Sequence, residues 1–138
     1  MFERILVAYD TSDQSESAFR NGLELAARFQ AELLVLSIAR PPEPPTRVEL
    51  QAELESARQH YEEAFARLRA AASKRGVVIQ TAVEVGHPAE QIVRIAERER
   101  SELIVMGRRG KTKLERWMLG SVSERVLRYA HCPVLVVH

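Results

Sequence analysis

The sequence predicts an α/β fold with one doubly wound, five-stranded parallel sheet, the strand order 3-2-1-4-5 and helices on both faces. Short apolar runs rich in branched residues alternate along the chain with segments whose apolar residues recur at helical spacing. Several of these runs are apolar at successive positions, which is typical of parallel strands covered on both faces. The 138 residues have the length of one domain, so we expect a single domain over 1–138.

The first unit is predicted to be strand, helix, strand. RILVAY at 4–9 and LLVLSI at 33–38 are the two strands. Between them, Asp13 and Glu16 are spaced as in a capping box, so the helix is expected to begin at Asp13. Apolar and small residues then follow at helical spacing, namely Ala18, Gly22, Ala26 and Phe29.

A proline-rich stretch at 40–47, RPPEPPTR, separates this unit from the rest. Four prolines forbid regular structure and predict a stiff surface loop. A domain linker is the alternative, but the 39 residues before it cannot complete a core alone. Apolar residues from Leu50 to Ala72 step by three or four and predict a long amphipathic helix that stops near Gly76.

The second half of the chain supplies three more strands. Residues 77–85 alternate between apolar side chains and Gln80 or Glu84, which predicts an edge strand with one face in water. The remaining predicted elements are a helix opened by Pro88, a buried strand at 103–106, a helix at 122–129 and a strand at 133–137.

Composition excludes several classes of protein. The longest apolar runs are too short to span a bilayer and no signal-peptide pattern opens the chain, so we expect a cytoplasmic protein without membrane insertion. The net charge is only +1, and Trp117 is the sole aromatic residue near the basic stretch, so no nucleic-acid partner is expected. The histidines lack the spacing of a zinc site, and Cys132 is expected to be a buried hydrophobe.

Two unusual loops are predicted to meet where the strand order reverses. In the order 3-2-1-4-5 the first and fourth strands are neighbours, and ligands bind at their carboxyl ends. The first of these loops is Asp10-Thr11-Ser12-Asp13. The second is the stretch MGRRGKTKLERWMLGS at 106–121, which contains five basic residues and three glycines.

The second loop has the chemistry of a polyphosphate site. Gly107 and Gly110 permit positive φ and close backbone approach, so successive N–H groups could face an anion. Gly120 and Ser121 begin a helix whose positive end favours phosphate. Asp10 suits ribose hydroxyls or a magnesium ion. A P-loop is excluded because Val105 stands where that motif requires glycine. A solvated turn is the bland alternative.

The spacing Gly107-x2-Gly110-x9-Gly120-Ser121 is similar to the G-x2-G-x9-G-[ST] signature of the universal stress protein family, in its ATP-binding branch. Other segments resemble the family in the same order, namely ILVAYDTSDQS, Val85-Gly86-His87-Pro88, ELIVMGRRG and HCPVLVV. The resemblance covers nearly the whole chain. The resemblance implies a Rossmann-like fold of the adenine nucleotide alpha hydrolase type.

The resemblance also implies ATP as ligand, with Mg²⁺, and a homodimer formed through Val134 to Val137. The chain departs from the family pattern at two positions, because Ser37 stands where the family often has histidine and Arg108 where it often has a small residue. Both departures bear on the affinity for nucleotide more than on binding itself. The nucleotide-binding residues at matching positions are Ala8, Asp10, Ile38, Met106, Gly107, Arg108, Arg109, Gly110, Lys111, Thr112, Lys113, Gly120, Ser121, Val122 and Ser123.

No catalytic residue is identified, because Asp10 is the only acidic residue that the sequence places at the site and its expected partners are ribose or metal. We therefore expect a nucleotide-dependent switch in the stress response rather than an efficient enzyme. Slow ATP hydrolysis or self-phosphorylation on Ser121 or Ser123 is one alternative, and a nucleotide-free dimeric scaffold is another. The sequence does not indicate the client protein.

Overall fold

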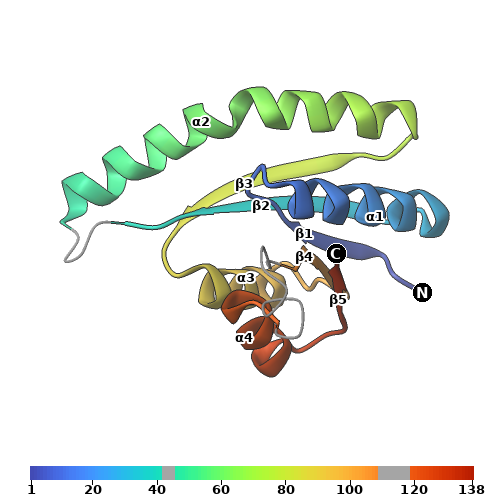
Figure 1. Ribbon diagram of the computed structural model, residues 1–138. Coiled ribbons are helices and arrows are strands. Elements are labelled where there is room, and N and C mark those ends of the chain that lie inside the picture. The colour runs from blue at the N-terminus through green and yellow to red at the C-terminus, as the bar shows by residue number, and fades with distance from the viewer. Residues whose placement is uncertain (42–45, 109–118) are drawn as a thin grey trace.

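The computed structural model describes residues 1–41, 46–108 and 119–138. Within these residues, five parallel strands form one sheet in the order β3-β2-β1-β4-β5 (Figure 1). The predicted class and strand order are confirmed. The strands are β1 (Arg4–Ala8), β2 (Glu32–Ala39), β3 (Ile79–Val85), β4 (Leu103–Gly107) and β5 (Val134–Val137).

Helices cover both faces of the sheet (Figure 1). The helices are α1 (Asp13–Phe29), α2 (Arg47–Lys74), α3 (Pro88–Arg98) and α4 (Ser121–Tyr129). On one face, Val7 and Val105 pack with Phe19 of α1 and Phe65 of α2. On the other face, Leu6, Leu36 and Ile104 pack with Ile92 of α3 and Val126 of α4. Successive strand residues thus enter opposite clusters, as their unbroken apolar runs predict.

The start of α1 corrects one prediction. The helix begins at Asp13, but its N-cap is Ser12, whose Oγ accepts a hydrogen bond from the Ser15 N–H at 3.2 Å. The predicted capping box of Asp13 and Glu16 is wrong, because the Glu16 carboxylate instead contacts Arg67. At the other end, Phe29 is 40% exposed and packs edge-on against Phe2.

Helix α2 begins three residues before the predicted start at Leu50. Thr46 and Glu49 form a capping box, with both reciprocal hydrogen bonds at 3.1 Å. The first turns extend past the sheet (Figure 1), and Val48 is exposed. The buried stripe of the helix starts only at Ala57. The capping box therefore stabilises the first turns of α2, which do not pack against the core.

The burial of edge strand β3 and of Cys132 differs in part from the prediction. Gln80 is exposed, but its neighbour on the same face, Ala82, packs against the cluster that contains Leu36, so only part of the face predicted to lie in water is exposed. Cys132 is half-buried at the rim of that cluster, and burial raises the pKa of its thiol. Among the described helices, none is long and apolar enough to cross a membrane.

Strands β1 and β2 differ in length, which shapes the carboxyl edge of the sheet. Ala8, the last residue of β1, pairs with Leu36. Strand β2 continues to Ala39, and β3 accompanies it as far as Val85. The edge of the sheet therefore steps up from β1 to the pair of β2 and β3.

Candidate functional site

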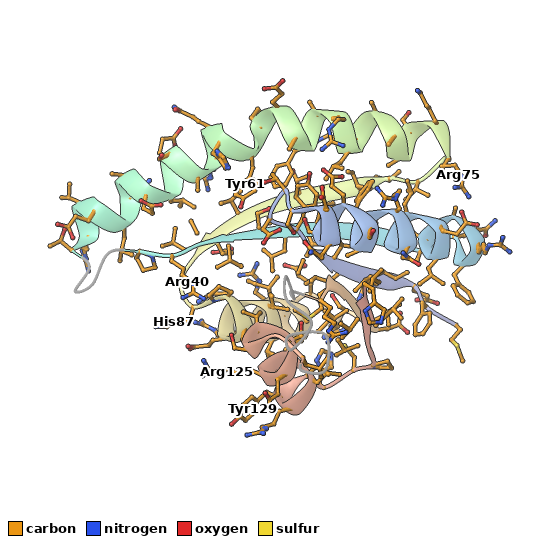
Figure 2. All side chains as sticks on the ribbon, in the orientation of Figure 1. Arg40, Tyr61, Arg75, His87, Arg125 and Tyr129 are labelled. Atoms are coloured by element: carbon orange, nitrogen blue, oxygen red, sulfur yellow. The ribbon has the colours of Figure 1, made fainter. Side chains whose placement is uncertain are left out.

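A cavity of about 270 Å³ lies at the carboxyl ends of the strands, beside the start of α4. The turn after β1 forms part of it, and the end of β4 lies next to that turn because β1 and β4 are neighbours in the sheet. Figure 2 shows Arg40 and His87 on the side of the molecule toward which the strands run. The cavity lies where the topology predicts a ligand site.

Most of the predicted nucleotide-binding residues that the structure describes line this cavity. The sequence separates them by up to 115 positions (8 to 123), and the fold brings them to one place. They are Ala8, Asp10, Ile38, Met106, Gly107, Gly120, Ser121, Val122 and Ser123.

The other predicted residues fall into two groups. Arg108 follows β4 and does not line the cavity, and its backbone N–H donates to the Val137 oxygen at 2.7 Å. That N–H extends the ladder between β4 and β5, so it does not serve the predicted anion cradle. The remaining predictions lie outside the described residues, namely Arg109, Gly110, Lys111, Thr112 and Lys113.

Several cavity residues are not among the predicted ones. Tyr9, Ser12 and Ser15 follow from the turn after β1, because any residue in that turn faces the same edge of the sheet. Arg40 could have been found by extending β2 two residues beyond Ile38. Among the described residues, the additional lining residues are Tyr9, Ser12, Gln14, Ser15, Leu36, Arg40, Pro88 and Ile92.

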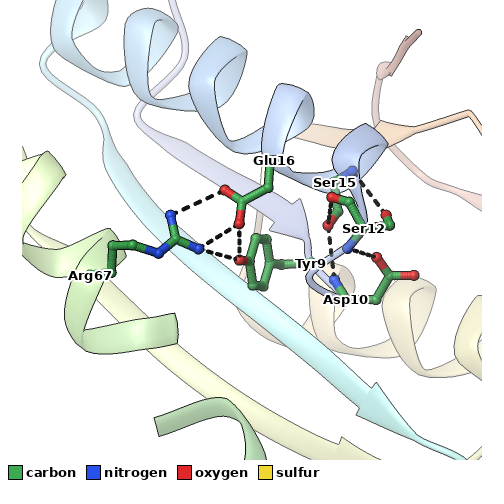
Figure 3. Close-up of polar contacts among 6 residues, drawn as sticks. All are labelled: Tyr9, Asp10, Ser12, Ser15, Glu16 and Arg67. Carbon is green, nitrogen blue, oxygen red and sulfur yellow. Dashed lines mark hydrogen bonds and ion pairs between the residues drawn. The ribbon is translucent and has the colours of Figure 1, made fainter. Parts of the chain in front are cut away.

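The Asp10 turn, defined here as Asp10 to Ser15, is held by its own hydrogen bonds (Figure 3). Asp10 Oδ1 accepts from the Ser12 N–H at 3.0 Å, and the Asp10 N–H donates to Ser15 Oγ at 3.2 Å. Ser15 Oγ in turn donates to the Ser12 carbonyl at 3.0 Å. Thr11 adopts φ +69°, a left-handed conformation that is costly for a β-branched residue. The turn is internally hydrogen-bonded and strained at Thr11.

Gly107 shows one of the two properties that the sequence suggests for it. Positive φ occurs at Gly76 and Gly86 among the described glycines and not at Gly107, but close backbone approach does occur there, to α1. A Cβ at Gly107 would lie 2.6 Å from the backbone carbon and oxygen of Gln14. Glycine therefore lets the first turn of α1 sit directly against the end of β4.

The first turn of α4 offers backbone donors to the cavity. Gly120 is the N-cap, with φ −60° and ψ 153°, and its carbonyl accepts from the Glu124 N–H at 2.9 Å. The N–H groups of Ser121, Val122 and Ser123 precede that bond, and no described residue accepts from them. Such a helix start favours anions.

Comparison with known proteins decides the family. The model of the universal stress protein family matches residues 1–138. The chain belongs to the universal stress protein family. A universal stress protein of Methanocaldococcus jannaschii is 38% identical over 140 residues, covering 99% of this chain and 82% of the relative.

Solved structures of universal stress proteins share the fold. The universal stress protein UspA from Lactobacillus plantarum superposes with a TM-score of 0.85 at 27% identity, covering 99% of this chain and 98% of that one. A universal stress protein in complex with cAMP gives a TM-score of 0.75 at 26% identity, covering 99% of this chain and 97% of that one. The resemblance stated from the glycine signature is thereby confirmed at the level of family and fold.

Proposed function

We propose that this universal stress protein binds an adenine nucleotide, ATP, in the cavity and acts as a nucleotide-dependent switch in the stress response. The observation that carries the proposal is the meeting of the Asp10 turn and the first turn of α4 at one cavity. Support also comes from the similar universal stress protein whose structure is a complex with cAMP, which is itself an adenine nucleotide.

The cavity has an apolar part and a polar part, as a nucleotide requires. Ile38, Ile92 and Met106 offer an apolar surface to a base, while Ser121 and Ser123 stand at the positive end of α4. The volume of about 270 Å³ is close to the lower end of the range for small-molecule sites, about 300 to 1,000 Å³. We infer that the phosphates face α4 and that the base lies toward β2.

The chemistry of the cavity also fits Mg²⁺ bound together with the nucleotide. Mg²⁺ takes oxygen ligands, and it commonly uses one or two carboxylates together with substrate phosphates. Asp10 supplies the carboxylate, and Ser121 and Ser123 supply hydroxyl oxygens on the opposite wall. When bound, the ion would neutralise phosphate charge.

Binding without efficient turnover is the activity we propose. Asp10 is the only acidic residue among the described residues that line the cavity, and its Oδ1 already accepts from Ser12. A general base for water attack must be placed within hydrogen-bond reach of that water. A switch requires only that ATP bind two conformations with different affinity. Incubation with ATP for many hours, followed by assays for ADP and for phosphate on the protein, tests for slow turnover.

We also propose that the protein is a homodimer through β5. In the described part of the sheet, β5 is an edge strand paired only with β4, and Leu135 is 37% exposed. An exposed apolar edge is satisfied by pairing with a second copy. Light scattering should give about twice the chain mass of 15.6 kDa for the wild type, and about the single-chain mass for Leu135→Lys. A monomeric wild type would contradict this proposal.

The test of nucleotide binding is calorimetric titration of nucleotide-stripped protein with ATP and magnesium. Gly120→Leu places a large side chain at the cavity without backbone strain, because Gly120 has ordinary extended dihedral angles. Gly76→Asn is the matched control, since Gly76 lies after α2 and asparagine tolerates its positive φ. We expect micromolar or tighter binding in the wild type and in the control, and loss of binding in Gly120→Leu. Absence of heat with the wild type would overturn the proposed function.

A further inference from the structure

Three polar side chains, two of them near the start of the chain and one from α2, form a cluster next to the cavity (Figure 3). Tyr9 follows β1, Glu16 lies in the first turns of α1, and Arg67 lies on α2. Arg67 Nη2 donates to Glu16 Oε1 at 2.5 Å and to the Tyr9 hydroxyl at 3.0 Å, and Nη1 lies 3.4 Å from Glu16 Oε2. The Tyr9 hydroxyl donates to Glu16. Each member of the cluster contacts the other two.

The cluster spans both ends of the Asp10 turn. Tyr9 immediately precedes Asp10, and Glu16 immediately follows Ser15. One guanidinium on α2 therefore holds the side chains that flank the turn on either side. The turn contains Thr11 at φ +69°. Such a conformation costs about 1–3 kcal/mol and persists only where the surrounding structure fixes it.

The backbone of Tyr9 is fixed as firmly as its ring. Its N–H donates to the Leu36 carbonyl at 2.9 Å, and its carbonyl accepts from Ser37 Oγ at 2.7 Å. The residue Tyr9 is 2% exposed, and Ser37 is fully buried. At the other end of the turn, the Glu16 N–H donates to the Ser12 carbonyl at 2.9 Å, and the Glu16 side chain is held by Arg67.

The charge states of the cluster favour these contacts at neutral pH. Burial alone would raise the pKa of Glu16, but hydrogen bonds from Arg67 and Tyr9 and the charge of Arg67 hold it below its ordinary value. Burial and the neighbouring Glu16 carboxylate raise the pKa of Tyr9 to about 12. Glu16 is therefore charged and Tyr9 keeps its proton, so the phenol donates to the carboxylate and accepts from the guanidinium.

We propose that Arg67 is a positioning residue for the nucleotide site, which holds the Asp10 turn in its strained conformation through Glu16 and Tyr9. The proposal rests on the proposed function, because Asp10 is positioned to contact the nucleotide that we propose binds in the cavity. It also links α2 to the cavity, although Arg67 does not line the cavity itself. A site fixed before binding loses less conformational entropy when ligand arrives.

The proposal is tested with Arg67→Met, the conservative Arg67→Lys and the control Arg69→Met. Arg69 is a matched residue of α2, since its side chain is 44% exposed against 59% for Arg67 and it is also bound, to Thr81 at 3.0 Å and Glu62 at 3.6 Å. Neither Thr81 nor Glu62 belongs to the Asp10 turn. Two quantities are measured for each protein, namely ATP affinity by calorimetry and amide hydrogen exchange at Ser12 and Ser15 without nucleotide.

We expect Arg67→Met to weaken ATP binding about fivefold or more and to speed exchange at Ser12 and Ser15 by a similar factor. Arg67→Lys should recover part of both losses, because lysine keeps the charge but not the planar fork. Arg69→Met should stay within about twofold of the wild type in both measurements.

Exchange rates at Ser12 and Ser15 that are unchanged in Arg67→Met overturn the proposal, whatever the affinity. Losses of the same size in Arg69→Met also overturn it, because the effect would then belong to α2 as a whole. Absence of ATP binding in the wild type overturns the proposed function instead, and the exchange rates then decide whether Arg67 holds the turn.

Discussion

The two walls of the cavity satisfy their polar groups in opposite ways. The Asp10 turn is held by hydrogen bonds among Asp10, Ser12 and Ser15, and the Arg67 cluster contacts the residues at both of its ends. The first turn of α4 begins at a glycine without a side-chain cap, and its first three N–H groups find no acceptor among the described residues. The Asp10 turn, the first wall, is thus held by bonds within the described residues, whereas the first turn of α4, the second wall, has three backbone donors with no acceptor among those residues.

This difference assigns the two walls different tasks. A wall that is already hydrogen-bonded can orient a ligand at little entropic cost, because it does not have to be ordered on binding. A wall whose N–H groups find no acceptor in the described part of the chain can supply binding energy to an anion. We therefore expect changes in the first wall to alter stability and geometry, and affinity only through them, whereas changes in the second wall alter affinity directly.

The largest expected effect is the loss of the first wall in Gly107→Ala. The added Cβ would lie 2.6 Å from the Gln14 backbone, so α1 or β4 must shift. We expect the free energy of unfolding to fall by about 2–3 kcal/mol, the upper part of the range of about 1–3 kcal/mol usual for overpacking, as measured by urea denaturation. Gly120→Ala, a change at a helix N-cap, should cost about 1 kcal/mol or less. Equal stability of Gly107→Ala and the wild type would contradict this account.

The second prediction concerns affinity without loss of stability. Ser121→Asp places a negative charge at the first position of α4, where phosphates are expected. ATP affinity should fall about tenfold or more, which is about 1.4 kcal/mol or more. Stability should hold or rise by about 0.3–1 kcal/mol, because aspartate favours a helix start. Ser121→Asn is the neutral control, and parallel calorimetry and thermal melting separate the two quantities. A Ser121→Asp protein that binds ATP normally would show that the phosphates lie elsewhere.

The third prediction concerns acid and the Arg67 cluster. The pKa of Glu16 is below its ordinary value in the folded protein, so its charge stabilises the fold above the unfolded value of about 4.5. That contribution is lost as the pH falls through the lower, folded pKa. The free energy of unfolding of the wild type should exceed that of Glu16→Gln by about 1 kcal/mol at pH 7. The difference is expected to be this small because Arg67 is largely exposed to solvent. The difference should shrink steadily below pH 4.5 in urea denaturation. A constant difference from pH 7 to pH 3 would contradict it, and the exposed Glu63→Gln serves as control.

The smallest expected effect sharpens the view of the first wall as strained. Thr11→Asn keeps a polar side chain but tolerates the left-handed conformation, so the free energy of unfolding should rise by about 0.5 kcal/mol. Thr11→Val keeps the branched Cβ and should show no gain. Chemical denaturation of both variants measures the difference. A gain of the same size in Thr11→Val would mean that the hydroxyl, not the backbone conformation, is responsible.

The sequence was sufficient for the layers, the strand order and the place of the cavity. Apolar periodicity identifies strands and helices, and the order 3-2-1-4-5 alone brings Asp10 beside the end of β4. It was insufficient where two segments meet at close range. The Gly107 contact with Gln14 and the bond from Arg67 to Glu16 depend on distances of a few ångströms between residues 93 and 51 positions apart, which no periodicity records.

The reliance of α1 on Ser12 was also missed, because Asp13 and Ser12 are both good capping residues and the spacing to Glu16 favoured the wrong one. The position of Arg40 was missed because β2 was predicted to end at Ile38, whereas it continues to Ala39. In both places the local signal was ambiguous by one residue, and tertiary contacts made the choice.

The step in the carboxyl edge of the sheet makes room for the cavity at no expense to the core. Strand β2 runs three residues past the pairing of Ala8 with Leu36, an overhang of about 10 Å at 3.3 Å per residue. The cavity thus lies above the packed clusters, beside the overhanging end of β2, and not within them. Lengthening or trimming the paired ends of β2 and β3 would change the depth of the cavity, and with it the size of ligand accepted, while Leu6, Val7 and their neighbours stay in place.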